Sequence, residues 1–410
     1  MLSFDKASDN QTITPPRAPR DTSKSSEYVS REKGHTSVVI IFTVTLKGHY
    51  LEFIHHLWQG AAVYNDYCDY VFVLPKEEWM EMNGLRDWPK AQNIKLRLLS
   101  KEDLAIRCSF PIMKRALSEC KLIKIILDEY PTATRLFLPN LGVVMPFLPL
   151  FIAKGIKVDG ILYSINIYEK HKGYLAIKEK IDYLLFSKSK VFRKIYLLNS
   201  QSAVDYNNRS YKTSRFYNLV DPVPSVDLSE CIDLRTKLEI DSATPVFLHF
   251  GAMDERKGTL EILKAIALLK DGEKRCFIFA GTISCSIKDE FEILLNQSNT
   301  SQSRVILIKG FLPYDYLHNL CKTCDCILAP YLATSCSSGV IGYAAVFGKP
   351  LIGSSNGLMG ELIRRYDLGN CLEPTPKSIA EAICAFQPYE LASKYQENNS
   401  LRHFIKTLFT

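Results

Sequence analysis

PVFLHFGAMDERKG, residues 245–258, is the stretch that decides the fold. Its first part, Pro245–Phe250, is apolar and predicts a buried strand, Gly251 allows a tight exit, and the spacing of Gly258–Lys270 predicts the helix that follows. Arg256 and Lys257 therefore stand where a helix begins, and a helix N-terminus with adjacent cations is an anion site. A solvated Asp-Glu-Arg-Lys turn is the alternative interpretation of these residues.

Strands and helices alternate through the rest of this half of the chain. Further strands are predicted at Cys276–Ala280, Val305–Ile308, Cys326–Ala329 and Pro350–Gly353. Helices are predicted between them at Ile287–Leu295, Tyr314–Cys321 and Val340–Phe347. Such an alternation is typical of a parallel sheet covered by helices.

The same alternation is present nearer the N-terminus. Strands are predicted at Ser37–Leu46, Tyr70–Pro75, Ile94–Leu99, Arg135–Pro139, Gly160–Ile165 and Lys194–Asn199, and helices at His49–Ala62 and Leu104–Tyr130. Several of these strands are apolar on both faces, which indicates a sheet covered on both sides. From Asp221 to Asp233 the chain is rich in proline and acidic residues, which is typical of a connector.

The predicted fold class is therefore α/β, with two Rossmann-like doubly wound domains facing a cleft. The predicted parts are a disordered leader at 1–36, an N-terminal domain at 37–222, a linker at 223–240, a C-terminal domain at 241–386, and C-terminal helices at 387–410 that pack back toward the N-terminal domain. Open α/β sheets bind ligands at the carboxyl ends of their strands, so the chemistry is expected between the domains.

Composition narrows the class of protein. The 410 residues are 47% apolar, which excludes wholesale disorder, and the net charge of +7 is smaller than dedicated nucleic-acid binders usually carry. The longest apolar run, Leu141–Ala153, contains two prolines and is shorter than the roughly 20 residues that a spanning helix needs. The N-terminal segment has no apolar core of a secretory signal, so the sequence predicts a cytoplasmic protein.

The chain has twelve cysteines, most of them in apolar segments such as Cys276–Ala280, which favours reduced thiols in the core. Cys321, Cys324 and Cys326 form a C-x-x-C-x-C pattern that is compatible with a metal site. No second pair of cysteines or histidines follows at zinc-ligand spacing, so core packing is predicted, without a metal or a cofactor.

Two further loops follow predicted strands and precede predicted helices. In the first, small hydroxyls and backbone N–H groups at Ser337, Ser338 and Gly339 could cradle a phosphate, although a simple helix cap explains them too. In the second, Asn356 and Gly357 lie where backbone can approach a ligand closely. Glu361, farther along the second loop, is expected at a helix start, as a dipole partner or a hydroxyl acceptor.

Together these three stretches resemble the C-terminal domain of retaining glycosyltransferases of the GT-B fold, specifically glycosyltransferase family 4, also called group 1. The resemblance covers about Pro245 to Pro374. The Ser337-Ser338-Gly339 form is similar to a divergent bacterial branch in which Ser-Ser-Gly precedes the helix.

The resemblance implies a role for each loop. Arg256 and Lys257 would contact the donor diphosphate and act in catalysis, within the loop bounded by Gly251 and Gly258. Ser337, Ser338 and Gly339 would lie beside the donor sugar and phosphate, and Asn356, Gly357 and Glu361 would support the nucleotide-sugar pocket.

Three positions depart from the family pattern. The family usually carries two glutamates eight positions apart, and Ser335 and Tyr343 stand at the matching places. Ala252 stands where an arginine usually follows the first glycine of the phosphate loop. The resemblance therefore implies that Arg256 carries more of the charge and leaves recognition of the donor ribose without its usual glutamate.

In the N-terminal half the resemblance is weaker. Gly48 and His49 follow the first predicted strand, where such enzymes have a glycine-bearing loop near the acceptor and the donor phosphates. His49 would hydrogen-bond a ligand there, or it is an ordinary residue at a helix start.

One basic segment holds most of the net charge. Between Glu169 and Lys194 eight cations and three acids give +5; the cations are Lys170, Lys172, Lys178, Lys180, Lys188, Lys190, Arg193 and Lys194. Ile177, Ile181, Leu184 and Leu185 share one helical face. The segment is predicted to be either a surface helix docked on the core through that face, or a contact with an anionic membrane bearing a lipid-linked acceptor.

The predicted function is transfer of a sugar from a nucleotide-diphosphate sugar to a carbohydrate or lipid-linked acceptor, with retention and without a metal, in polysaccharide biosynthesis. A sugar-nucleotide epimerase of the same architecture and a non-catalytic nucleotide-sugar-binding protein are the alternatives. The predicted location is the cytoplasm, with peripheral contact at the inner face of the membrane through 169–194.

Overall fold

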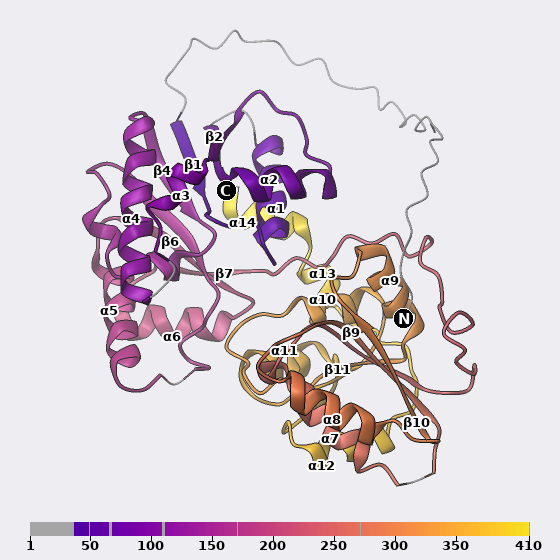
Figure 1. Ribbon diagram of the computed structural model, residues 1–410. Helices are drawn as coiled ribbons and strands as arrows, with labels where there is room; N and C mark the ends of the chain where they lie inside the picture. Colours follow the sequence, from indigo (N-terminus) through magenta and orange to yellow (C-terminus); the bar gives the residue numbers. More distant parts are fainter. Residues whose placement is uncertain are drawn as a thin grey trace, which may run out of the picture. The chain divides into compact units, whose positions relative to one another are not determined.

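A parallel sheet of seven strands forms from the first half of the chain, in the order β3-β2-β1-β4-β5-β6-β7 (Figure 1). Its strands are β1 (Ser37–Phe42), β2 (Cys68–Pro75), β3 (Ile94–Leu99), β4 (Ala133–Leu138), β5 (Lys157–Leu162), β6 (Phe192–Leu198) and β7 (Phe216–Leu219). The accompanying helices are α1 (Tyr50–Val63), α2 (Lys76–Met82), α3 (Lys101–Ala105), α4 (Ile112–Glu129), α5 (Tyr174–Lys188) and α6 (Gln201–Tyr211), with short 3₁₀ turns η1 (Asn83–Leu85), η2 (Leu141–Val144) and η3 (Leu148–Leu150).

A second parallel sheet, of six strands, has the order β10-β9-β8-β11-β12-β13. Its strands are β8 (Val246–Met253), β9 (Arg275–Ile283), β10 (Ser303–Lys309), β11 (Cys326–Ala329), β12 (Leu351–Ser354) and β13 (Gly369–Leu372). The helical elements are η4 (Glu255–Lys257), α7 (Thr259–Ala267), α8 (Lys288–Ser298), α9 (Tyr314–Thr323), α10 (Gly339–Val346), α11 (Gly357–Tyr366), α12 (Pro376–Cys384), α13 (Tyr395–Asn398) and α14 (Leu401–Phe409).

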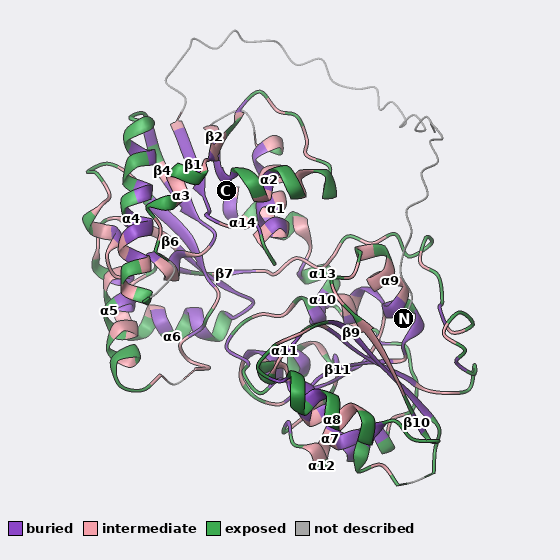
Figure 2. Cartoon of the chain, in the orientation of Figure 1, coloured by how far each residue is buried: buried purple, intermediate pink, exposed green. Residues whose placement is uncertain are grey.

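The computed structural model describes residues 37–48, 50–64, 68–108, 111–169, 171–270 and 272–409. The predicted leader at 1–36 lies outside them, and residues 37–410 form one compact unit. The strands are largely buried, whereas the helices expose their outer sides (Figure 2). None of the described helices combines the length and apolarity needed to cross a bilayer.

The strand orders decide where ligands can bind. The order reverses between β1 and β4 in the first sheet and between β8 and β11 in the second. At such a switch point the connections leave to opposite sides, so a crevice opens at the carboxyl ends of the two strands. The α/β class and the two doubly wound parallel sheets predicted from the sequence are confirmed.

The last helix returns to the first sheet. Phe404 of α14 is fully buried, and its ring lies 5.7 Å from that of Phe53 in α1. The aromatic side chains thus fix the end of the chain on one face of the first sheet, while α4 covers the other face (Figure 1). The domain boundaries stated above stay predictions.

Local polar groups explain where elements differ from their predicted bounds. The first strand ends at Phe42 instead of Leu46, because the Leu46 N–H donates to the Glu78 carboxylate, 2.5 Å away, and not to a neighbouring strand. The helix predicted over Leu104–Tyr130 is interrupted, since proline cannot continue a helix, and Pro111 precedes the first turn of α4.

The basic segment contains the predicted helix, α5, but the apolar face that was predicted to dock does not. Of its four residues, Ile177, Ile181 and Leu184 are exposed and only Leu185 packs against the core, while the buried side carries Tyr183 and Phe186. The two aromatic side chains offer more apolar surface to the core than the aliphatic ones, which explains the rotation. The core-docked interpretation of that face is wrong.

Candidate active site

The loop after β8 is held by its own capping interactions. The Asp254 carboxylate accepts a hydrogen bond from the Lys257 backbone N–H at 2.9 Å, which closes the turn η4. Gly258 follows with φ of +70°, and a Cβ on it would lie 2.2 Å from the Pro330 carbonyl oxygen. Only glycine fits there, so this contact brings the start of α7 against the loop after β11.

Two cations share one aromatic ring at this switch point. The Lys257 ammonium and the Arg256 guanidinium each lie 5.6 Å from the ring centroid of Tyr331, which is buried. Lys257 also donates to the Phe250 carbonyl at 3.4 Å, whereas the Arg256 side chain is 46% exposed. Positive charge is therefore held beside a π face at the carboxyl ends of β8 and β11. Arg256 and Lys257 thus lie together at one aromatic ring.

Near the Lys257 ammonium lies a histidine, His249, that was not predicted from the sequence. His249 Nδ1 is 3.0 Å from the Leu328 carbonyl, and Nε2 is 3.0 Å from the Thr259 hydroxyl. Burial lowers the pKa of His249 to about 4, so the ring is neutral, with its proton on Nδ1, because a carbonyl can only accept. The His249 ring thereby connects β8 to β11 and α7. In the sequence, the signal for its role was a single polar residue within an apolar strand.

The Ser-Ser-Gly loop is tied to the segment that follows β7. Ser337 donates to the Asp221 carboxylate at 2.6 Å and accepts from the Asn199 amide at 3.2 Å. The Asn399 side-chain amide in turn donates to the side-chain oxygen Oδ1 of Asn199 at 2.6 Å. This network connects the start of α10 to both segments that run between the sheets, and none of its members except Ser337 was predicted.

Ser338 and Gly339 form the start of α10. Ser338 occupies the N-cap without a side-chain cap bond, and its hydroxyl lies 3.2 Å from that of Tyr331. Around Gly339 there is open space, since a Cβ built there meets nothing within 4 Å. The backbone N–H groups of this first turn thus face room next to Tyr331 and its two cations, as an anion site requires.

Glu361 acts as a hydroxyl acceptor, although not at a helix start, because it is the fifth residue of α11. Its carboxylate accepts hydrogen bonds from Tyr168 and, at 2.9 Å, from Ser202, both in the first half. Asn356 is exposed at the N-cap of α11, and Gly357 begins that helix. The third predicted loop therefore also connects to the first half.

The two positions where the family pattern expects glutamates have protein partners. The Ser335 carbonyl accepts from the Ile165 backbone N–H at 3.0 Å. The rings of Tyr343 and Phe250 form a T-shaped pair, with centroids 5.5 Å apart. Nearby, the Arg86 guanidinium lies 4.3 Å above the Tyr314 ring, so a cation from the first half reaches the α9 side of this region.

The loop after β1 carries the residues predicted for the acceptor side. Gly48 is exposed with φ of +66° and open space around it, while His49 lies outside the described residues. Glu78 anchors this loop, since its carboxylate also accepts from the Thr45 hydroxyl at 3.0 Å. The geometry leaves Gly48 accessible to a ligand.

A pocket at the switch point of the first sheet was missed. It is small, with a volume of about 30 Å³, and lies at the carboxyl ends of β1 and β4; its polar lining includes Thr43, Tyr50, Arg115, Glu119 and Asn140. The buried Glu119 carboxylate holds the guanidinium of Arg115 at 2.9 Å. Residues this far apart in sequence carry no shared motif, so only the strand order reveals the pocket.

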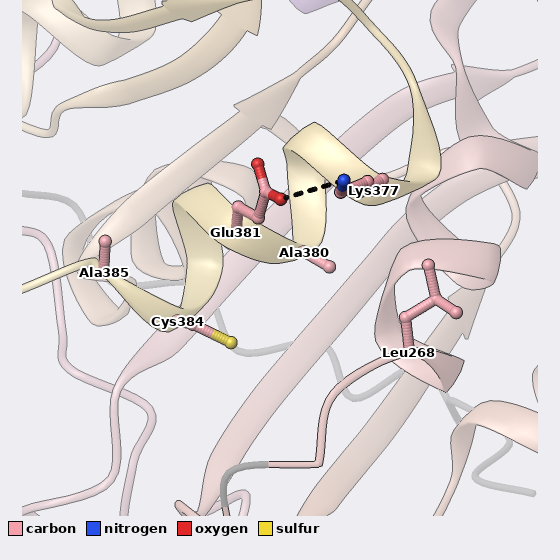
Figure 3. A pocket seen from close by; sticks show the side chains of 6 residues that line it. All are labelled: Leu268, Lys377, Ala380, Glu381, Cys384 and Ala385. Atoms are coloured by element: carbon pink, nitrogen blue, oxygen red, sulfur yellow. Dashed lines mark ion pairs between the residues drawn. The ribbon is translucent and has the colours of Figure 1, made fainter.

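Other features lie apart from these loops. The pocket in Figure 3 lies between α12 and the end of α7, where Lys377 and Glu381 pair at 3.8 Å, and contains none of the predicted site residues. Cys321, Cys324 and Cys326 are buried, and burial raises the pKa of Cys324 to about 12. In the part of the chain that the structure describes, no group of three or more His, Cys, Asp or Glu is placed to hold a metal.

Similar solved structures define the fold class as GT-B. WaaG, a glycosyltransferase involved in lipopolysaccharide biosynthesis, matches with a TM-score of 0.60 and 17% identity over 90% of this chain and 93% of its own. HepE from Anabaena, solved with UDP and glucose, has a TM-score of 0.61 at 14% identity over 91% and 97%. Sucrose-phosphate synthase from Thermosynechococcus elongatus has a TM-score of 0.61 at 13% identity over 92% and 95%.

A family match is present in the second half of the chain. Residues 232–400 match the family described as glycosyl transferases group 1. This span contains the three loops singled out from the sequence. No curated protein sequence matches the chain significantly.

Proposed function

We propose that the protein transfers a sugar from a nucleotide-diphosphate sugar to a carbohydrate or lipid-linked acceptor, with retention of the anomeric configuration and without a metal. It would act in the cytoplasm, in the synthesis of a polysaccharide or a glycolipid. The group 1 domain and the nucleotide-bound complex of HepE support a nucleotide-sugar donor.

One observation carries this proposal. Arg256 and Lys257 lie around Tyr331 at the switch point of the second sheet, beside the open first turn of α10 at Gly339. Two cations and a helix N-terminus lie close together there, and this combination of groups binds a diphosphate.

The proposed chemistry is electrostatic. As the bond between the anomeric carbon and the diphosphate breaks, negative charge grows on the leaving phosphate, and Arg256 and Lys257 would neutralise it together with the dipole of α10. The acceptor hydroxyl would attack from the same face, with the leaving phosphate taking its proton, so no protein nucleophile is assigned. The surface formed by the loops around Arg115 and Glu119, at the carboxyl ends of β1 and β4, is the proposed place for the acceptor.

The test compares Lys257→Ala with Lys288→Ala, which removes an exposed lysine from α8. We expect Lys257→Ala to lower the transfer rate by about 100-fold, as loss of one transition-state donor does, and Lys288→Ala to leave it unchanged. Transfer by Lys257→Ala at the wild-type rate would remove Lys257 from the mechanism. Calorimetry with uridine, guanosine and adenosine diphosphates identifies the base.

Three further measurements test the transferase assignment, retention and metal independence. Incubation with the nucleotide sugar alone distinguishes a transferase, which waits for an acceptor, from an epimerase, which releases a new sugar. The anomeric proton coupling of the product reports retention or inversion. Activity that persists in a strong chelator supports metal independence, whereas activity restored only by a divalent cation contradicts it.

A further inference from the structure

The outer face of α5 is apolar and has no partner within the described residues. The helix docks on the first sheet through Tyr183, whose ring stacks on Phe216 with centroids 5.6 Å apart, and through the buried Phe186. These contacts bury the inner face of α5. The opposite side is therefore not needed to hold the helix in place.

Four large apolar side chains line this outer face. Tyr174, Ile177, Ile181 and Leu184 are 55%, 61%, 44% and 52% exposed. Their spacing of three and four residues places them on one stripe, about 15 Å long at 1.5 Å of rise per residue. Single exposed aliphatic residues are common on proteins, but a continuous stripe along one helix marks an interaction surface.

Several lysines lie on α5 or next to its ends, close to the apolar stripe. Lys180 and Lys188 are exposed on the helix, and Lys172 and Lys190 lie just beyond its ends. Lys178 alone among the helix lysines is in an ion pair with a described residue, at 2.6 Å from Asp182. The outer face thus combines apolar side chains with positive charges that the described residues do not neutralise.

This combination discriminates between partners. A second copy of the chain docked through the same stripe would bring its lysines against those of the first, which disfavours a dimer. A bilayer with anionic headgroups accepts both components, because the apolar side chains enter the boundary of the acyl chains while the lysines stay at the phosphates.

We propose that the outer face of α5 docks the protein on an anionic bilayer surface. This inference extends the proposed function, because a lipid-linked acceptor would be presented at the same membrane surface. It rests on the proposed function in that respect alone. Binding to vesicles needs neither a nucleotide sugar nor an acceptor, so the two proposals fail separately.

The experiment is co-sedimentation of the full chain with vesicles of phosphatidylcholine alone and of an equal mixture of phosphatidylcholine and phosphatidylglycerol. We expect binding to the mixture to be at least about tenfold tighter, and to weaken at high salt. The variant Ile177→Ser with Ile181→Ser should reduce that binding about tenfold, and Lys180→Glu with Lys188→Glu should reduce it as much.

Matched controls lie on α8, where Ile293 is 59% exposed and Lys288 stands in the first turn. Ile293→Ser and Lys288→Glu should bind the mixture like the wild type, and the thermal midpoint of each variant confirms that it is folded. Absence of binding by the wild type, or equal losses in the α8 variants, would overturn the proposal. So would a dimer in sedimentation velocity that Ile177→Ser with Ile181→Ser abolishes.

Discussion

The hydroxyl of Ser337 donates a hydrogen bond to the carboxylate of Asp221, 2.6 Å away, and joins the loop before α10 to the segment after β7. A serine predicted to face the donor therefore also sets the position of its own loop. Because Asn199 donates to the same hydroxyl, any change at Asp221 is transmitted to the start of α10.

Replacing Asp221 with asparagine should stabilise the protein at high pH. Burial, partly offset by the Ser337 bond, raises the pKa of Asp221 to about 6, so the folded state holds the proton more tightly than the unfolded state. Stability contributed by this group is present at low pH and is lost as the pH rises through about 6. Asp221→Asn should gain about 1–2 kcal/mol at pH 8 and nothing near pH 4.

The thermal midpoints of wild type and Asp221→Asn at both pH values test this expectation. Asp289→Asn, at an exposed carboxylate of α8, is the control and should show no such difference. A gain of equal size at both pH values would assign the effect to packing and not to titration.

Removing the Tyr331 ring should weaken binding of a nucleoside diphosphate. The ring holds both Arg256 and Lys257, and cation–π contacts contribute about 0.5–2 kcal/mol. Tyr331→Leu should raise the dissociation constant about tenfold in calorimetry. Tyr331→Phe keeps the ring and loses only the contact with Ser338, so it should bind almost as the wild type does; equal losses in both variants would contradict the role of the ring.

Two glycines should respond differently to a single added methyl group. Gly258→Ala places a Cβ 2.2 Å from the Pro330 carbonyl at a positive φ, and should lower stability by about 2 kcal/mol or more. Gly339→Ala meets nothing and should leave the thermal midpoint unchanged or higher. If the space at Gly339 holds a phosphate, the same variant weakens donor binding; unchanged binding would place the phosphate elsewhere.

Neutralising Arg115 should affect the acceptor and not the donor. Arg115 lines the switch-point pocket of the first sheet and is held by the buried Glu119. Arg115→Gln should raise the KM for the acceptor about tenfold, as loss of a charged hydrogen bond does, with an unchanged donor dissociation constant. Arg107→Gln, which loses its own bond to Glu119 at a position not among the pocket-lining residues, is the control. A rise in the donor constant would contradict the acceptor assignment.

Phe404→Ala should destabilise the protein by about 3–5 kcal/mol. The ring is fully buried against Phe53, so its loss leaves a cavity that the surrounding helices fill only in part. Arg402→Ala, at an exposed position of the same helix, should change the thermal midpoint little. Equal effects of the two variants would show that α14 does not depend on this contact.

Local sequence patterns predicted the elements well where apolar periodicity was strong. The strand at Ile94–Leu99 and the strand at Cys326–Ala329 have their predicted bounds. The short strand β7 was missed, because four residues without a β-branched side chain carry little periodic signal.

By itself the sequence determined the α/β class and the placement of Arg256, Lys257 and the Ser-Ser-Gly loop at helix starts, because strand, turn and helix signals are local. Only the tertiary structure decided the contacts of those residues. The contacts of both cations with Tyr331, the Ser337–Asp221 bond and the pocket at Arg115 join segments far apart in the chain. The outward apolar face of α5 arises because Tyr183 and Phe186 occupy the core instead. Such contacts depend on strand order and on competition between side chains for the core, and no local pattern encodes either.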